Sequence, residues 1–203
     1  MLRSTLLMMA MMLFVAIAPD ARAATADDAR QFVDGVGKRV LGIVNGSGGE
    51  AQKQKELQQM FSDTVDMAWM GQFVLGHAWQ QATEDQRNRY LQAYKQYLLA
   101  RYTTNFADYT GAKYTITDAK PEEDGQFIVN MQINAPKQSQ DTLAGYRLRP
   151  SEGGAFKITD IIIEGVSLIT TQRSDFSSTV QNGGIDTLIK DLEAKAQTEK
   201  QKS

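Results

Sequence analysis

Apolar and polar residues alternate along this chain with two different periods, a helical one first and an extended one later. Over residues 26–44 the apolar positions recur every three to four residues, which predicts an amphipathic helix ended by a glycine-rich loop. Two shorter helices are predicted over residues 50–60 and 63–75, and Gly76 is placed to close the second of them. The first half of the chain is therefore expected to be helical.

A capping box opens the longest predicted helix. Thr83 stands at the N-cap position and Gln86 three residues later, the pairing that satisfies two free backbone N–H groups at a helix start. The helix is expected to run to about Tyr109, and aromatic residues recur along one of its faces. Such a face can stack on a ligand, but burial in a core is its more common role, so the sequence favours core packing.

From about Lys113 the period changes to two, which is typical of strands with one buried face. Four strands are predicted to begin near Lys113, Phe127, Ala144 and Ala155, with tight turns between them. In the last strand the apolar residues change face, so either a bulge lies near Asp160 or the strand is covered on both sides. Consecutive strands with tight turns form an antiparallel meander, and helices before and after it give an α+β fold.

The first 23 residues have the features of a cleaved export signal. Arg3 gives a positive start, residues 6–18 form an apolar run of about 13 residues, and residues 21–23 have the small-x-small pattern that a signal peptidase reads. The run is too short to span a bilayer core of about 30 Å. A permanent anchor is therefore not predicted. Because no Cys follows the cleavage site, a lipoprotein signal is not predicted either.

Without residues 1–23 the chain is still long enough to bury one sizeable core. We expect residues 24–196 to form a single domain and residues 197–203 to be a flexible polar tail. The full chain has no Cys and a formal net charge of −2, which becomes −3 without the leader. Thiol catalysis and Cys-based metal sites are thereby excluded, and a nucleic-acid partner is not expected. No feature demands more than a monomer.

Residues that typically carry catalysis are few. His77 is the only histidine, and a lone histidine close to a tryptophan is more often structural than catalytic. Asp63 and Asp66 lie three residues apart and could share a helix face, but carboxylates at a helix start usually serve the cap and the dipole. No nucleotide-binding, metalloprotease or hydrolase motif is present. The sequence favours binding over catalysis and implies no cofactor.

Two stretches of the chain follow one another in a recognisable order. The first is FVLGHAW at residues 73–79, followed by the capping box at Thr83 and the aromatic helix. The second is EGVSLITT at residues 164–171, followed by GID at residues 184–186. Over roughly residues 26–192, this order resembles the toluene-tolerance family of periplasmic lipid-binding proteins. That family includes the soluble phospholipid shuttle of the Mla transport system and a relative associated with hopanoid biosynthesis.

The resemblance implies a periplasmic carrier that is not an enzyme and needs no cofactor. Such proteins hold the acyl chains of a phospholipid in an apolar cavity between a curved sheet and helices, and leave the head group outside. They carry lipid between an inner-membrane ABC-type transporter complex and an outer-membrane lipoprotein–porin complex, which maintains the lipid asymmetry of the outer membrane. The expected fold is therefore a curved four-stranded antiparallel sheet packed against helices from both ends of the chain, with such a cavity between them.

The lipid-binding residues are expected on the apolar strand faces and on the adjoining helices. An ordinary solid core would explain these residues equally simply, and only the resemblance favours a cavity. Gly165 is expected to relieve strain where the last strand turns into a helix, and Ser167 to cap that helix. The candidate lining residues are Met70, Phe73, Val74, Phe127, Val129, Met131, Tyr146, Leu148, Ile161, Ile163, Val166 and Leu168.

Three other functions stay open at this point. A carrier of another lipid, such as a hopanoid, would use the same fold and differ in the shape of its cargo. An enzyme with a small helix-plus-sheet cone fold would use His77, or Asp63 and Asp66. A non-catalytic adaptor would have a solid core and would only dock to an envelope complex.

Overall fold

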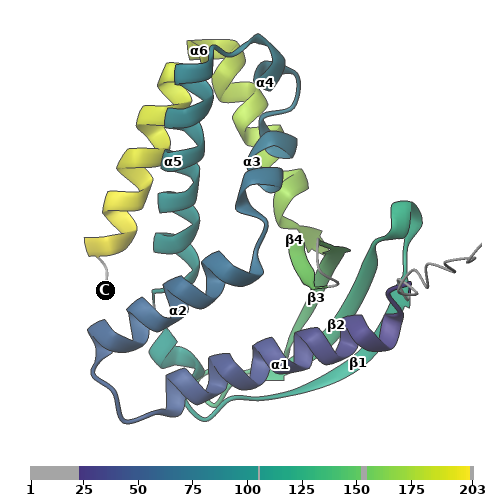
Figure 1. Ribbon diagram of the computed structural model, residues 1–203. Coiled ribbons are helices and arrows are strands. Elements are labelled where there is room, and N and C mark those ends of the chain that lie inside the picture. The colour runs from purple at the N-terminus through teal and green to yellow at the C-terminus, as the bar shows by residue number, and fades with distance from the viewer. Residues whose placement is uncertain (1–22, 105, 152–154, 202–203) are drawn as a thin grey trace, which may run out of the picture.

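The computed structural model describes residues 23–104, 106–151 and 155–201, so the predicted export signal lies almost entirely outside it. Helices and strands follow one another in the order expected of an α+β fold (Figure 1). No helix of the described residues combines the length and the apolarity needed to cross a membrane. The helices are α1 (Ala26–Asn45), α2 (Glu50–Thr64), α3 (Met67–Leu75), α4 (His77–Gln81), α5 (Glu84–Tyr102) and α6 (Leu168–Gln201). The strands are β1 (Lys113–Pro121), β2 (Phe127–Asn134), β3 (Thr142–Pro150), β4 (Phe156–Ile163) and β5 (Val166–Ser167), and two 3-10 turns are η1 (Phe106–Tyr109) and η2 (Glu123–Gly125).

Side chains at the helix ends set several of the predicted boundaries. The backbone N–H of Gln86 donates to the hydroxyl of Thr83 over 3.2 Å, and the Gln86 side chain accepts from the Thr83 N–H over 3.1 Å. The predicted capping box of α5 is therefore confirmed. Gly76 closes α3 with a φ of 57°, as expected, and Ser167 caps α6 by accepting from the N–H of Thr170 over 3.2 Å.

The helix predicted over residues 63–75 begins later than expected, because the backbone first pairs with the sheet. The N–H of Asp66 donates to the carbonyl of Ile158 in β4 over 2.9 Å, which holds the α2–α3 connection extended. The Asp66 side chain then accepts from the N–H of Trp69 over 3.0 Å and caps α3. As a result α2 extends to Thr64 and α3 starts at Met67.

The long helix α5 ends at Tyr102, and the prediction that it runs to about Tyr109 is wrong. The hydroxyl of Thr103 donates to the carbonyl of Leu99 over 2.6 Å and satisfies one of the carbonyls that a helix end leaves free. The separate turn η1 spans Phe106–Tyr109. The short helix α4 after Gly76 was not predicted.

The sheet has five strands, and the predicted number of four is corrected here. Its order is β1-β2-β3-β4-β5, and every neighbouring pair is antiparallel, which confirms the meander. The additional strand β5 follows a tight turn in which Glu164 and Gly165 have φ angles of 49° and 79°. A strand of two residues is too short to show a period in the sequence, so the pattern could not reveal it.

A β-bulge in β4 explains why its apolar residues change face in the sequence. Arg147 pairs with Asp160 and Leu148 with Ile158, which leaves Thr159 as the extra residue. An extra residue returns the following side chains to the face that the preceding ones occupied. Of the two alternatives that the sequence leaves open, the bulge near Asp160 is therefore the one that the structure shows.

Helices pack against the sheet in two places, one at β1 and β2 and the other at β4. In Figure 1, α1 runs along β1 and β2, whereas α3 and the first part of α6 lie next to β4. The chain reverses at Gly184, which has a φ of 77°, and the last part of α6 runs beside α5. Asp186 fixes this return by accepting hydrogen bonds from Arg89 over 2.8 Å and from Gln86 over 3.0 Å.

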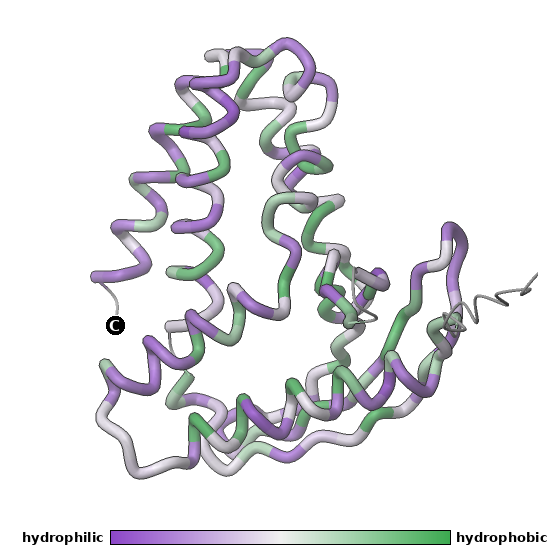
Figure 2. Tube along the Cα trace, in the orientation of Figure 1, coloured by the Kyte–Doolittle hydropathy of each residue, from purple (hydrophilic) through white to green (hydrophobic). Residues whose placement is uncertain are grey.

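Apolar side chains from α1, α3, α5, α6 and the sheet meet in one continuous group, which we call the main cluster. A smaller cluster of Val44, Leu57 and Met60 joins α1 to α2. Apolar and polar positions are interleaved along most helices and strands (Figure 2), so each element buries one side and exposes the other. The core is therefore assembled from many short contributions and not from one apolar segment.

Helix α6 continues through part of the segment that the sequence predicts as a flexible tail. Ala196 is buried, and Arg101 of α5 forms an ion pair with Glu199 over 3.7 Å. The helix extends to Gln201. Residues 197–201 are therefore helical in the structure.

Gly35 and Gly37 of α1 differ in their surroundings and give a matched pair of variants. A Cβ at Gly35 would meet no atom within 4 Å, whereas a Cβ at Gly37 would lie 2.7 Å from Cζ of Tyr114. Gly35→Ala should raise the free energy of unfolding by about 0.5–1 kcal/mol, because Ala loses less backbone entropy in a helix. Gly37→Ala should lower it, because the Tyr114 ring must move and its 2.9 Å hydrogen bond to Asp34 is lost. Urea unfolding measures both, and equal effects would contradict the close packing of α1 on β1.

Candidate functional site

The structure brings ten of the twelve predicted lining residues into the main cluster, although they come from five elements. The buried ones are Met70, Val74, Phe127, Val129, Met131 and Leu148. Those that are partly buried and pack against the cluster are Phe73, Tyr146, Ile161 and Leu168. The apolar strand faces and the adjoining helices thus share one apolar region.

Ile163 and Val166 lie apart from that region. They pair with each other across β4 and β5, and 43% and 61% of their surfaces are exposed. Ile163 also pairs with Ala144 of β3, which is a buried member of the main cluster. The apolar face of the sheet therefore reaches the solvent at this end.

The predicted cavity between the sheet and the helices is not shown by the structure. Two hollows open at the surface of the described residues, and none of the twelve predicted residues lines either of them. The buried side chains of the main cluster pack against one another between the sheet and the helices.

A few polar groups interrupt the main cluster between α3, α5 and α6. The hydroxyl of Tyr90 donates to the carbonyl of Gly71 over 3.0 Å, and that of Tyr94 donates to Oε1 of Gln172 over 2.6 Å. The other end of the Gln172 amide, Nε2, is buried and has no partner among the described residues. Burial raises the pKa of Tyr94 well above its usual value and that of Tyr146 to about 12. The Tyr94 and Tyr146 phenols are therefore neutral at physiological pH.

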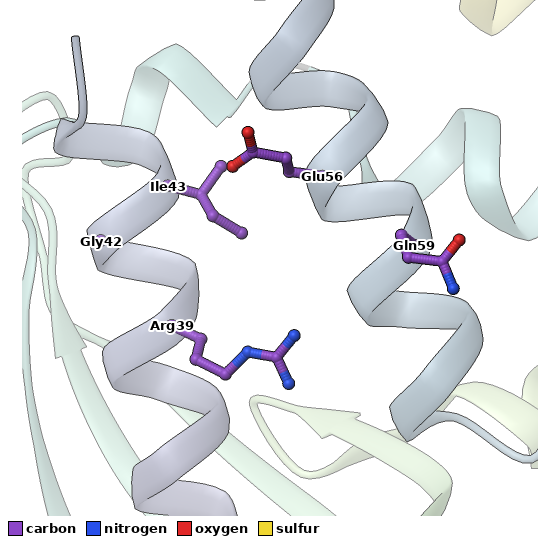
Figure 3. A pocket seen from close by; sticks show the side chains of 5 residues that line it. All are labelled: Arg39, Gly42, Ile43, Glu56 and Gln59. Carbon is purple, nitrogen blue, oxygen red and sulfur yellow. The ribbon is translucent and has the colours of Figure 1, made fainter. Parts of the chain in front are cut away.

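The first hollow lies between α1 and α2 and has a volume of about 400 Å³ (Figure 3). Its lining residues are Arg39, Gly42, Ile43, Glu56 and Gln59. The Arg39 side chain extends from α1 into the space between the two helices. The Glu56 side chain enters the same space from α2, close to Ile43. Because one positive and one negative side chain share the hollow, its charge favours neither an anion nor a cation.

The second hollow, of about 520 Å³, lies where α2 meets α3, and we call it the α2–α3 hollow. Its apolar lining consists of Val65, Met67 and Ala68. Its polar lining consists of Ser62, Asp66, Lys95, Ser151 and Lys157. The hollow thus combines an apolar wall with two positive side chains.

Three arginines hold α3 and α4 by stacking on aromatic rings. Arg149 binds the Asp66 carboxylate over 2.7 Å and lies 5.3 Å from the centre of the Trp69 ring. Arg173 lies 4.9 Å from the centre of the Phe73 ring and donates to the Phe73 carbonyl over 2.7 Å. Arg87 of α5 likewise stacks on the Trp79 ring of α4 and donates to the Trp79 carbonyl. The guanidinium groups thereby fix both ends of α3 and the end of α4.

The residues considered for catalysis are separated in the fold. His77 is exposed on α4, and its Nε2 lies 3.2 Å from the amide nitrogen of Gln81. Asp63 accepts from Gln59 near the end of α2, and Asp66 caps α3. Within the described ranges, no group of three or more His, Asp or Glu residues is placed to hold a metal ion. The acidic pair and the histidine thus lie at opposite ends of α3.

The two lysines of the α2–α3 hollow were not found by sequence reasoning. Lys95 belongs to the exposed side of α5 and Lys157 to β4, and neither belongs to a motif. Only the tertiary structure brings an α5 side chain and a β4 side chain to the same hollow. No spacing in the sequence carries a signal for this pair.

Comparison with known proteins gives matches that cover most of the chain. The family model described as "MlaC protein" matches residues 35–194. The chain is 24% identical over 135 residues to the intermembrane phospholipid transport system binding protein MlaC of Haemophilus influenzae, covering 65% of this chain and 63% of that relative. It thus spans less than two thirds of the relative's length.

A solved structure gives a match at the level of the fold. The phospholipid-binding protein from Ralstonia solanacearum, determined in complex with a phospholipid, matches with a TM-score of 0.73 and 21% identity. The match covers 84% of this chain and 98% of the other. The two chains therefore share their fold.

Tyr94→Phe tests the polar contact inside the main cluster. The variant leaves both ends of the buried Gln172 amide unpaired, so the free energy of unfolding should fall by about 1–3 kcal/mol. The double variant Tyr94→Phe/Gln172→Leu removes both partners and should recover most of this loss. Tyr102→Phe, at an exposed tyrosine of the same helix, should change stability by less than about 0.5 kcal/mol. Thermal and urea unfolding measure all three, and a double variant as unstable as the single one would refute this account.

Proposed function

The chain belongs to the MlaC protein family, and on this basis we propose that it binds a phospholipid and carries it across the periplasm. Its predicted export signal supports that location. The partners would be an inner-membrane ABC-type transporter complex and an outer-membrane lipoprotein–porin complex. Transfer between them would maintain the lipid asymmetry of the outer membrane. The protein would act as a monomer, without catalysis and without a cofactor.

The family match over residues 35–194 is the observation that carries this proposal, and the fold shared with a phospholipid-binding protein supports it. A two-chain phospholipid has about 30 methylenes, and exposing each to water costs about 0.8 kcal/mol. Unaided passage through an aqueous compartment would therefore cost on the order of 20 kcal/mol. A protein that covers the chains removes most of this cost, and the main cluster offers an apolar region for that purpose.

We place the acyl chains between the apolar face of the sheet and helices α3 and α6, among the ten predicted residues of the main cluster. Helix α1 packs on β1 and β2, whereas α3 and α6 pack on β4. Lipid chains that enter between the sheet face and helices α3 and α6 would replace contacts among apolar side chains by contacts with methylenes of similar polarity. Such an exchange changes the free energy little, which suits a carrier that must also release its cargo.

Native mass spectrometry of the protein purified from its own envelope without detergent tests the proposal. We expect an added mass of about 700 Da, that of a lipid with about 30 methylenes, and lipid extraction should return a phospholipid. A polycyclic adduct would assign the protein to another lipid, such as a hopanoid. A bare protein that also takes up no lipid from vesicles would refute the carrier and leave a non-catalytic adaptor or an enzyme.

Val129→Trp tests the placement of the acyl chains. Val129 has no exposed surface on the sheet face that joins the main cluster, so an indole there would fill the space assigned to lipid. The variant should stay folded and carry much less lipid. Leu143→Trp is the control, because Leu143 is 55% exposed and should keep its cargo. If Val129→Trp keeps its full cargo and loses about 1–3 kcal/mol of stability, the site is a packed core and the placement is wrong.

A further inference from the structure

The α2–α3 hollow differs from the main cluster in having positive charge beside an apolar wall. Lys95 and Lys157 line it together with the hydroxyl residues Ser62 and Ser151. Its volume of about 520 Å³ lies within the range of ordinary small-molecule pockets, roughly 300–1,000 Å³. Size and lining are therefore suited to a small anionic group with an apolar part attached.

The positive charge of both lysines is available within this hollow. Lys157 donates from Nζ to the backbone carbonyl of Asp63, a neutral acceptor. Among the described residues, neither Lys95 nor Lys157 forms an ion pair with a carboxylate. An anion that enters would therefore not have to displace an acidic partner from either ammonium group.

The acidic residue that lines the hollow is already compensated. The Asp66 carboxylate binds Nη2 of Arg149 over 2.7 Å and accepts from the N–H of Trp69 over 3.0 Å. Since Arg149 and the helix N-terminus both offset its charge, Asp66 opposes an incoming anion only weakly. Lys95 and Lys157 are thus the charged lining residues that no ion pair among the described residues offsets.

The apolar wall of the hollow continues into the main cluster. Val65 is 4% exposed and is a member of that cluster, and Met67 packs against it. The same cluster contains Met70, one turn further along α3 and one of the predicted lining residues. A ligand with its anionic group at the lysines can therefore lead its apolar part along Val65 and Met67 toward the region assigned to the acyl chains.

From this arrangement we infer that the α2–α3 hollow binds the phosphate group of the phospholipid cargo, with Lys95 and Lys157 as its cationic ligands. The inference rests on the proposed function, because it assumes a lipid whose chains reach the main cluster. Free inorganic phosphate offers the same charge and acceptor oxygens, so the test must distinguish the two sources. The hollow would give the carrier a preference for lipids that contain phosphate over neutral lipids with the same chains.

The experiment compares lipid uptake by the purified protein from two kinds of vesicle. One kind contains phosphatidylglycerol and the other contains diacylglycerol with the same acyl chains in a neutral carrier lipid, and the protein-bound lipid is quantified by mass spectrometry. In Lys95→Gln/Lys157→Gln, uptake of phosphatidylglycerol should fall about tenfold at low salt, since charge-assisted contacts are lost. Uptake of diacylglycerol should stay unchanged, which also verifies that the variant is folded.

Two matched variants complete the design. Lys190→Gln/Lys195→Gln removes the same charge from exposed positions of α6 outside the hollow, and it should behave as the wild type. Lys95→Arg/Lys157→Arg keeps the charge and should retain most of the uptake of phosphatidylglycerol. If Lys95→Gln/Lys157→Gln takes up phosphatidylglycerol as the wild type does, or no more weakly than the Lys190→Gln/Lys195→Gln control, the inference is overturned.

Two further outcomes separate this inference from the proposed function. Calorimetric titration with inorganic phosphate should give only weak binding; tight binding that is lost in the Lys95→Gln/Lys157→Gln variant, with lipid uptake unchanged, would assign the hollow to free phosphate and overturn the inference. A wild-type protein that takes up neither lipid would refute the carrier itself. Uptake of both lipids without a preference for phosphate would overturn only the head-group site.

Discussion

The buried carboxylate of Asp160 determines how the sheet and the last helix meet. None of its surface is exposed, and it accepts from Nη1 of Arg147 over 2.9 Å, the Ser167 hydroxyl over 2.7 Å and the N–H of Ile169 over 3.2 Å. A buried charge is costly unless it is paired and hydrogen-bonded. Its three partners lie in β3, in β5 and in the first turn of α6, so these elements must be in place together. The bulge at Thr159 supports this by setting Asp160 opposite Arg147.

The position of α6 follows from that junction and in turn closes the main cluster. Because α6 starts at β5, its first part brings Phe176 against the ring of Tyr94, edge to face with centroids 6.0 Å apart. After the reversal at Gly184, Leu188 and Leu192 return along α5 and are buried. The sheet thus has α6 and α3 at its β4 end and α1 along β1 and β2. The apolar region lies where these groups of elements meet.

The sequence predicted those features that depend on neighbours within a few residues. The capping box at Thr83 and the cap at Ser167 are of this kind, as are the strand periods and the bulge near Asp160. Features that depend on distant contacts were missed. Helix α3 starts late because the Asp66 N–H bonds to β4, and β5 forms because a two-residue segment pairs with β4. Among the residues of the candidate site, too, those set by the local pattern were predicted and those brought together by distant contacts were missed.

Strand alternation placed Val129 and Leu148 on one apolar face, and both are buried members of the main cluster. Periodicity gives the face of a residue but not whether another element covers it, and Val166 at the end of the sheet is 61% exposed. A pattern of apolar residues also cannot distinguish a filled core from a space for lipid. Lys95 and Lys157 are isolated in the sequence, so only the fold could bring them to one hollow.

Under the proposed function, the distribution of hydrogen bonds determines where the carrier would open to accept lipid. Helices α3, α5 and α6 are joined by buried polar contacts of Tyr90 and Tyr94, and breaking one of these would leave a buried group unpaired at a cost of about 1–3 kcal/mol. Helix α1 is joined to β1 by the bond from Tyr114 to Asp34. Each group is therefore held together internally by hydrogen bonds. The sheet ladders and the buried carboxylate junction join the two groups along β3 and β4. The face between α1 and β4 is apolar, as in the tilted pair of Phe32 on α1 and the β4 ring it meets at a centroid distance of 5.9 Å. Methylenes can replace such ring contacts without leaving a donor or acceptor unpaired, so under the proposed function the separation of these apolar surfaces, with the sheet intact, is the opening that lipid chains would compensate.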